Sequence, residues 1–188
     1  TLPTRGVLEI EYKKLRSAVR TERLIVLTTK SNLLVPLAAD RIVGGTTPEA
    51  TEKVCALYST FVKGELLKTN SRTAEMSKLT ENSFRDVNIA FANELSMICD
   101  DLGIDTMELI RLANHHPRVN ILTPGCGVGG HCIAVDPWFV VSRSPERAKL
   151  IRCAREENDY KSDWVIAKVR ETYKAFGKFR PKIAILGL

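Results

Sequence analysis

The segment from Thr73 to Leu102 constrains the fold most, because it predicts a single long amphipathic helix. At about 100° per residue, its large apolar side chains gather on one broad arc, which predicts the face that meets the core. These residues are Met76, Leu79, Phe84, Val87, Phe91, Leu95 and Ile98. Lys78, Asn82 and Arg85 gather on the opposite side, and Gly103 follows as a typical helix stop. The chain is therefore expected to be mainly α-helical.

Shorter elements are expected before this helix. The apolar run 24–27 predicts a buried strand. Thr47 is a good N-cap with Pro48 in the first helical position, which predicts a helix to about Lys63. Residues 65–69 then predict a short strand or an extended link.

Two further helices are expected after the long one. Asp105 and Glu108 form a capping-box pattern for a short helix to about Asn114, which Pro117 ends. The run Ser144-Pro145-Glu146 predicts the start of another long helix, closed by Gly177. Its apolar positions include Leu150, Ile151, Val165, Ile166 and Val169.

Cys132 lies in the glycine-rich stretch 123–137, the part of the chain that says most about chemistry. A thiol on such a turn has backbone N–H groups nearby and room for a substrate, which favours a nucleophilic role. The alternative is an ordinary glycine loop with an inert cysteine. Local composition leaves both interpretations open.

Two other functions for this stretch are disfavoured. Gly125, Gly127 and Gly130 fit a G-x-G-x-x-G pattern, but dinucleotide binding needs a strand before it and a helix after it. Only residues 119–122 can supply the strand, and Pro137 is expected to interrupt the helix. A metal site is also disfavoured. Cys126 and Cys132 are six residues apart, and His115 and His116 are adjacent, and neither spacing matches a zinc ligand pattern.

Composition narrows the setting and the partners. Five cysteines, an odd number without a regular framework, predict free thiols in a reducing cytoplasm. The sequence shows no secretory leader and no apolar run of membrane-spanning length. The net charge of +6 is spread among acidic residues rather than gathered in a stripe, which favours an anionic small molecule over nucleic acid or a membrane.

Several separated motifs occur together in one order. They are Ser71–Asn82 (SRTAEMSKLTEN), His116–Arg118 (HPR), and Gly129–Cys132 (GGHC) with Asp136. From about Arg41 to Leu188 the chain resembles the central part of the UDP-glucose/GDP-mannose dehydrogenase family, the nucleotide-sugar 6-dehydrogenases. The resemblance implies an NAD-dependent oxidation of a UDP-sugar, a helical central domain that forms a homodimer, and α/β domains before and after it.

The resemblance also implies roles for particular residues. Cys132 matches the nucleophile that captures the sugar aldehyde, and Asp136 matches the carboxylate that activates water. Lys78 matches a lysine that assists proton transfer or stabilises an oxyanion, and Asn82 a residue that orients the sugar or a water. The substrate-binding set carried over in this way is Lys78, Asn82, Arg85, His116, Arg118 and Gly129.

Departures from the family pattern refine this expectation. Cys126 stands where relatives carry proline, which permits an inhibitory disulfide with Cys132. Val135 stands where relatives that use UDP-glucose carry lysine, which favours UDP-N-acetyl-D-mannosamine as the substrate. The expected division is 1–40 as a remnant of the NAD-binding domain, 41–177 as the helical domain, and 178–188 as the first strand of a UDP-binding domain. The competing hypothesis is a non-catalytic remnant that keeps the dimerisation core.

Overall fold

The computed structural model describes the backbone of residues 24–28 and all of residues 38–176 and 182–184. The chain divides into two compact units between Thr80 and Glu81, inside helix α3 (Ser71–Leu102). Most of the described residues are helical, which confirms the expected fold class.

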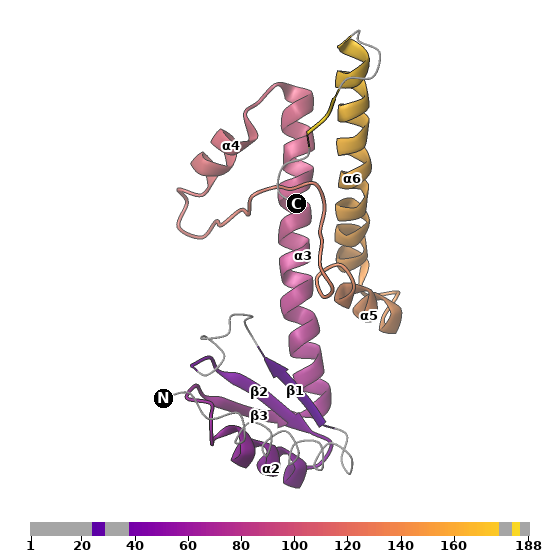
Figure 1. Ribbon diagram of the computed structural model, residues 1–188. Helices are drawn as coiled ribbons and strands as arrows, with labels where there is room; N and C mark the ends of the chain where they lie inside the picture. Colours follow the sequence, from indigo (N-terminus) through magenta and orange to yellow (C-terminus); the bar gives the residue numbers. More distant parts are fainter. Residues whose placement is uncertain (1–23, 29–37, 177–181, 185–188) are drawn as a thin grey trace. The chain divides into compact units, whose positions relative to one another are not determined.

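The first unit is a small sheet with one helix against it (Figure 1). Strand β1 (Leu24–Thr28) pairs antiparallel with β2 (Arg41–Gly45), which pairs parallel with β3 (Leu66–Asn70). Helix α2 (Pro48–Tyr58) connects β2 to β3, and its Val54 and Cys55 pack on Val43 of β2 to form the core. The expected strand at 24–27 and the extended segment at 65–69 are both confirmed.

Helix α2 begins as predicted but ends sooner. The Thr47 side chain accepts a hydrogen bond from Ala50 N at 3.2 Å, and Pro48 lies in the first turn. The predicted end near residue 63 is wrong, because the helix ends at Tyr58. The hydroxyls of Ser59 and Thr60 donate to backbone carbonyls one turn back, which stabilises a turn in place of further helix.

Strand β2 was not predicted, because its Gly44 and Gly45 resemble a loop. A Cβ at Gly44 would lie 2.4 Å from Asn70 O and 2.7 Å from Ala74 Cβ. The strand therefore requires glycine where the first turn of α3 approaches it closely.

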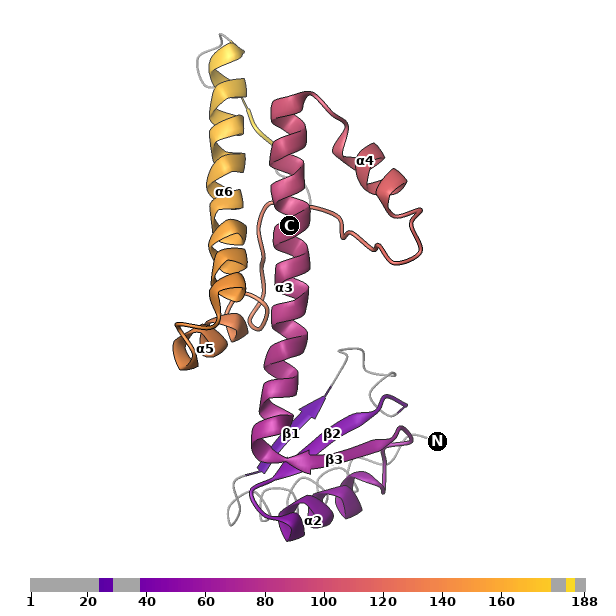
Figure 2. The same ribbon diagram turned by 180° about the vertical axis from the view of Figure 1, so that it is seen from behind.

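The second unit contains the rest of α3 and three more helices: α4 (Thr106–Ala113), α5 (Asp136–Arg143) and α6 (Lys149–Ala175). Helices α3 and α6 lie side by side in both views (Figures 1 and 2). They run in the same direction, since ion pairs join Asp86 to Arg155 and, further along both helices, Asp100 to Lys168. Gly103 follows α3 with a φ of 65°, as expected of a helix stop.

The predicted core face of α3 is wrong. Phe84 is 68% exposed and Phe91 50% exposed, whereas polar Asp86 and Asn93 are fully buried. The reason is that α6 presents hydrogen-bonding partners to the polar face of α3. Within the described chain, Met76, Phe84, Phe91 and Ile98 of the apolar arc are exposed, and its other members are half-buried.

Helix α6 differs from its prediction in the same way. Leu150 is 69% exposed and Ile166 47% exposed, while Arg155, Asn158 and Lys161 are buried. Periodicity placed the apolar positions correctly on the helix, but hydrogen bonding between the helices decides which face is covered.

The boundaries of the later helices are clear in the structure. The Asp105 side chain accepts hydrogen bonds from Met107 N and Glu108 N, which confirms the start of α4. The expected start of α6 at Ser144 is wrong, since the Ser144 carbonyl accepts from both Arg147 N and Ala148 N and closes a turn before the helix. Residues 177–181 and 185–188, with the expected helix stop at Gly177 and most of the expected last strand, lie outside the described residues.

Candidate active site

Cys132 is exposed and lies in the turn that leads into α5. Its carbonyl oxygen accepts hydrogen bonds from Val135 N at 3.0 Å and Asp136 N at 2.7 Å. Pro137 lies in the first turn of α5, so the expectation that it interrupts a helix is wrong. Proline is tolerated there because the first N–H groups of a helix have no partner within it.

Asn82 and Asp136 are brought together. Asn82 on α3 is 4% exposed, and its Nδ2 donates a hydrogen bond to Asp136 Oδ2. A carboxylate at the first turn of α5 is therefore fixed by an amide from α3. Two residues with implied catalytic roles meet beside the turn that carries Cys132.

The other residues with implied roles on α3 are Lys78 and Arg85. Lys78 is half-buried and belongs to the first unit, one helical turn before Asn82. Arg85 is exposed on the second unit. An exposed guanidinium one turn from Asn82 is able to meet an anionic group.

His116 and Arg118 are exposed in the turn after α4. Asn114 supports this turn, because its Nδ2 donates to Ile121 O at 3.0 Å and its Oδ1 accepts from Ile121 N at 2.7 Å. His116 Nδ1 accepts from Arg118 N at 3.3 Å. No hydrogen bond or ion pair within the described chain joins either side chain to Asn82, Asp136 or Cys132.

Gly129 is exposed, and a Cβ built on it would meet nothing within 4 Å. Close approach of a ligand is therefore possible there, but packing within the described chain does not demand a glycine. Gly127 differs, since its φ of 132° is unfavourable for other residues and its Cβ would lie 2.5 Å from Ser162 Oγ.

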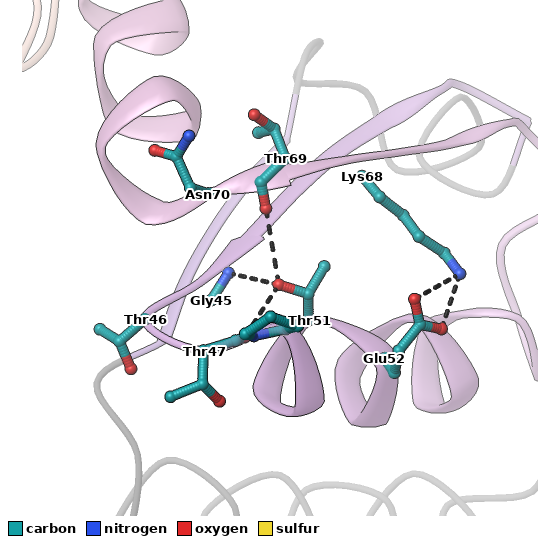
Figure 3. Close-up of a pocket in the computed structure, with 9 residues that line it drawn as sticks. Gly45, Thr46, Thr47, Thr51, Glu52, Lys68, Thr69 and Asn70 are labelled. Atoms are coloured by element: carbon teal, nitrogen blue, oxygen red, sulfur yellow. Dashed lines mark hydrogen bonds and ion pairs between the residues drawn. The ribbon is translucent and has the colours of Figure 1, made fainter.

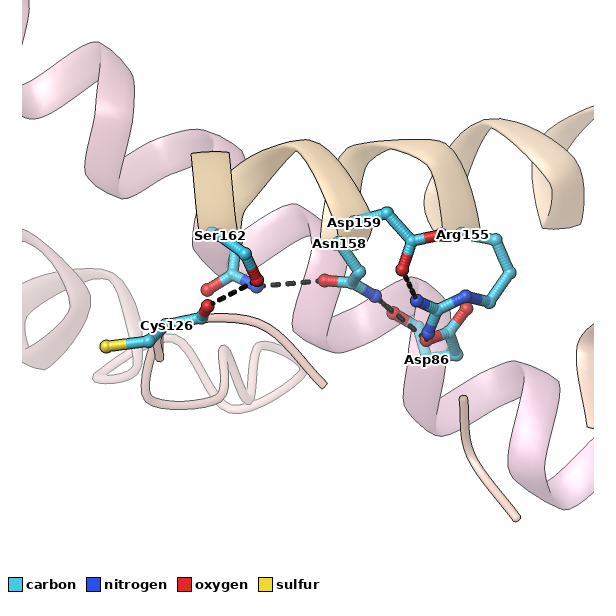
Figure 4. Close-up of polar contacts among 7 residues, drawn as sticks. Asp86, Cys126, Arg155, Asn158, Asp159 and Ser162 are labelled. Carbon is cyan, nitrogen blue, oxygen red and sulfur yellow. Dashed lines mark hydrogen bonds and ion pairs between the residues drawn. The ribbon is translucent and has the colours of Figure 1, made fainter. Parts of the chain in front are cut away.

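A buried polar network behind this loop was missed by sequence reasoning (Figure 4). Arg155 NH1 donates to Asp86 Oδ1 at 2.6 Å, and Asn158 Nδ2 donates to the same oxygen at 2.8 Å. Asn93 Nδ2 in turn donates to Asn158 Oδ1 at 2.8 Å. The available signal was the seven-residue spacing of Asp86 and Asn93, which places both on one face of α3.

The network is costly to bury. Burial raises the pKa of the Asp86 carboxyl, while the Arg155 guanidinium and the Asn158 amide oppose that rise. Within the described chain, Asp86 Oδ2 and Arg155 Nε have no hydrogen-bond partner. Such a network fixes a particular arrangement of helices more than it adds stability.

A separate hollow of about 330 Å³ lies in the first unit (Figure 3). It lies where β2 and β3 end and α2 begins, and its lining includes Thr47, Thr51 and Lys68. Lys68 Nζ donates to both carboxylate oxygens of Glu52, at 2.9 and 2.7 Å. That hydrogen bonding raises the Lys68 pKa. None of the residues with implied catalytic roles lines this hollow.

Two absences hold for the residues that the structure describes. Neither unit gathers three or more histidine, cysteine, aspartate or glutamate side chains in an arrangement suited to a metal ion. No helix there is both long and apolar enough to cross a membrane.

Residues 72–160 match the central domain of the UDP-glucose/GDP-mannose dehydrogenase family. The chain is 62% identical over 149 residues to the UDP-N-acetyl-D-mannosamine dehydrogenase of Campylobacter jejuni, and 67% identical over 131 residues to that of Escherichia coli K12. Residues 72–160 therefore carry a central domain of the UDP-glucose/GDP-mannose dehydrogenase family.

Solved structures of the family have the same fold. The UDP-N-acetyl-mannosamine dehydrogenase Cap5O of Staphylococcus aureus matches with a TM-score of 0.71 at 46% identity, over 81% of this chain and 38% of that one. The UDP-D-ManNAc dehydrogenase of Pyrococcus horikoshii matches with a TM-score of 0.74 at 40% identity, over 82% and 38%.

The alignments cover only part of the relatives. The matches take in 79% and 70% of this chain but 36% and 31% of the Campylobacter jejuni and Escherichia coli proteins. The chain therefore spans about a third of the length of these family members. A further relative, from Ralstonia nicotianae, is 60% identical and is an NDP-N-acetyl-D-galactosaminuronic acid dehydrogenase. Similarity at this level thus extends across proteins named for different sugars.

Proposed function

We propose that this chain is the nucleophile-bearing central part of an NAD-dependent UDP-sugar 6-dehydrogenase. The reaction oxidises UDP-N-acetyl-D-mannosamine to UDP-N-acetyl-D-mannosaminuronate. The observation that carries the proposal is the hydrogen bond from Asn82 to Asp136 at the turn of Cys132. It holds an amide of α3 against a carboxylate that lies four residues after the Cys132 thiol.

The chemistry assigned to these residues concerns the sugar. The Cys132 thiolate adds to the C6 aldehyde carbon, and the covalent adduct keeps the aldehyde from escaping. At the thioester stage, Asp136 accepts a proton from the attacking water, while Asn82 holds the carboxylate in place. Lys78 stabilises developing oxygen charge, and Arg85 contacts the sugar or a diphosphate oxygen. His116, Arg118 and Gly129 complete the substrate contacts.

NAD, when bound, accepts the hydrides of the two oxidation steps. The described residues do not fit this cofactor, because its diphosphate needs a glycine turn between a strand and a helix. The glycine run 125–130 follows irregular backbone rather than a strand.

The exposed apolar arc of α3 supports a homodimer. Phe84, Phe91 and Ile98 recur every seven residues, and Leu102 follows four residues later. Their exposed fractions are 68%, 50%, 44% and 66%. A stripe at this spacing is suited to pairing with the same stripe of a second copy.

The setting that we propose is the cytoplasm. All five cysteines are free in the structure, and two of them, Cys126 and Cys132, stand six residues apart in the exposed loop. A reducing compartment keeps such thiols from pairing.

The first test is NADH formation by the purified chain with UDP-N-acetyl-D-mannosamine and NAD. Cys132→Ala is expected to abolish any turnover that the parent chain shows, without loss of stability, because this side chain is exposed. A second UDP-linked 2-acetamido sugar, UDP-N-acetyl-D-galactosamine, is measured in parallel, since a relative is named for that sugar series. A faster reaction with this substrate would overturn the sugar assignment.

A second candidate is a non-catalytic remnant that keeps the dimerisation core. Two observations favour it. The described residues include no glycine turn between a strand and a helix that would bind a dinucleotide, and the apolar stripe of Phe84, Phe91, Ile98 and Leu102 on α3 is exposed. A folded dimer that forms no NADH with either sugar supports this candidate and contradicts the enzyme proposal.

A further inference from the structure

The glycine loop before Cys132 is hydrogen-bonded to two helices at two consecutive residues and packs closely against one of them at the next. Gly125 N donates to Asn93 Oδ1 on α3 at 2.9 Å. Ser162 Oγ on α6 donates to Cys126 O at 2.8 Å (Figure 4). Gly127 lies so close to α6 that a Cβ there would come within 2.5 Å of the same Ser162 hydroxyl.

Asn93 is itself held in one orientation. Its amide nitrogen donates to Asn158 Oδ1, so its oxygen must face Gly125 N. Asn158 is fixed in turn, because its nitrogen donates to Asp86 O at 3.0 Å and to Asp86 Oδ1 at 2.8 Å. Asn93, Asn158 and Asp86 are all fully buried, so water does not compete for these bonds.

The same loop is fixed again at its far end. The Cys132 carbonyl accepts from the backbone of Asp136, and the Asp136 side chain accepts from Asn82. Between Gly127 and Cys132, by contrast, a Cβ on Gly129 or Gly130 would meet nothing within 4 Å. The loop is therefore held at 125–127 and at 132–136, with an open stretch between them.

We propose that Asn93, Asn158 and Ser162 are positioning residues that hold the loop of Cys132 on the α3–α6 pair. The inference rests on the proposed function for the role of Cys132 as nucleophile. Asn93 and Ser162 bond to the loop backbone, and Asn158 orients Asn93, so none of the three needs to touch the substrate. Ser162 bonds to the backbone carbonyl of Cys126, so this contact does not depend on which side chain stands at position 126. The Cys126 side chain itself is exposed.

Ser162→Ala tests the proposal with the smallest change. The bond that it removes is solvent-exposed, so the variant is expected to fold. Thr172→Ala is the matched control, because it removes a hydroxyl-to-carbonyl hydrogen bond on the same helix, from Thr172 Oγ1 to Lys168 O, away from the loop. Ser162→Thr keeps the hydroxyl and serves as the conservative variant.

The first readout is hydrogen–deuterium exchange resolved by peptide. We expect exchange of the 124–132 segment to accelerate about fivefold in Ser162→Ala, with the α4 and α6 peptides unchanged. Thr172→Ala should leave the loop as in the parent chain, and Ser162→Thr should restore it. An equal acceleration in the helices, or none in the loop, would overturn the proposal.

The second readout is the rate of Cys132 alkylation by iodoacetamide, measured against exposed Cys153 in the same molecule. A released loop presents its thiol in more orientations, so the ratio should rise about threefold in Ser162→Ala and return in Ser162→Thr. If exchange of the loop is faster in Ser162→Ala but the alkylation ratio is unchanged, Ser162 holds the loop without positioning Cys132, and the proposal is overturned. Neither readout needs turnover, so a chain without NADH formation would count against the proposed function and leave these results standing.

Discussion

At the scale of single residues, the ion pair between Asp86 and Arg155 is the most consequential feature behind the loop. Both side chains are at most 1% exposed, and Arg155 also donates to Asp159 on its own helix. Removing one partner of a buried pair leaves an uncompensated charge in a poorly solvated place. The cost of that charge depends on whether Asp86 is able to take up a proton.

Arg155→Met is expected to lower the free energy of unfolding by about 3–5 kcal/mol at pH 7. Burial already raises the Asp86 pKa, and loss of the guanidinium raises it further. A carboxyl with a higher pKa in the folded state than in the unfolded state binds its proton more tightly when folded. Stability therefore falls as the pH rises through that range, so the deficit should be smaller at pH 5 than at pH 7.

Urea unfolding of the parent and of Arg155→Met at both pH values measures this effect. The double variant Arg155→Met/Asp86→Leu is the control, because it removes the stranded charge and should recover much of the loss at pH 7. A deficit that is the same at both pH values would show that lost packing, rather than the Asp86 charge, dominates.

Local sequence signals predicted individual caps well and the buried network poorly. Thr47 and Asp105 act on N–H groups within their own first turns, so nearby residues suffice to identify them. Asp86 and Asn93 bond to partners on α6 more than sixty positions away. On α3 alone such residues look like a solvated face, because polarity and exposure normally coincide.

At the scale of elements, the buried faces of α3 and α6 were predicted wrongly for the same reason: their hydrogen-bonding partners lie on another helix. The length of α3, its end and its division into polar and apolar faces were all predictable from its own residues. Which face is covered depends on the neighbouring helix, and hydrophobic periodicity assumes that the covered face is the apolar one. For Cys132, Asn82 and Asp136, in contrast, the resemblance pointed to residues that the structure gathers in one place, although their catalytic roles remain predictions.

The end of α3 offers a test of an element boundary. Gly103 has a φ of 65°, and a Cβ there would meet nothing within 4 Å, so backbone strain is the only penalty for a side chain. Gly103→Ala is expected to lower stability by about 1 kcal/mol. Gly103→Asn should lower it less, since asparagine tolerates this region better than other residues. Chemical denaturation compares the two, and equal losses would contradict the strain argument.

At the scale of the whole molecule, the chain forms two compact units that share helix α3. Strand β1 pairs with β2 in the first unit, so residues before and after the expected boundary at residue 41 belong to one sheet. The sheet order was not predictable, because β2 has the composition of a loop and β1 pairs with it across residues 29–40. The domain limits at 41 and 178 remain predictions.

The outward stripe of α3 leads to the last prediction. Apolar side chains this exposed are costly in water, and self-association would bury Phe84, Phe91, Ile98 and Leu102 together. Phe91 lies in the middle of the stripe, where a charge would be desolvated in the dimer. Phe91→Glu is therefore expected to weaken association by at least about 2 kcal/mol, roughly thirtyfold in Kd.

Light scattering coupled to size exclusion distinguishes the states, since one chain has a mass of 21.0 kDa. The parent should elute at about twice that mass and Phe91→Glu at the mass of one chain. Leu150→Glu is the matched control, because Leu150 is equally apolar and 69% exposed but lies on α6. A dimer that survives Phe91→Glu contradicts the proposed pairing through the apolar arc of α3. If Leu150→Glu dissociates that dimer instead, the contact is made by α6. If Phe91→Glu dissociates the dimer and Leu150→Glu does not, the second copy covers the apolar face of α3, which explains why α3 packs on α6 through its polar face.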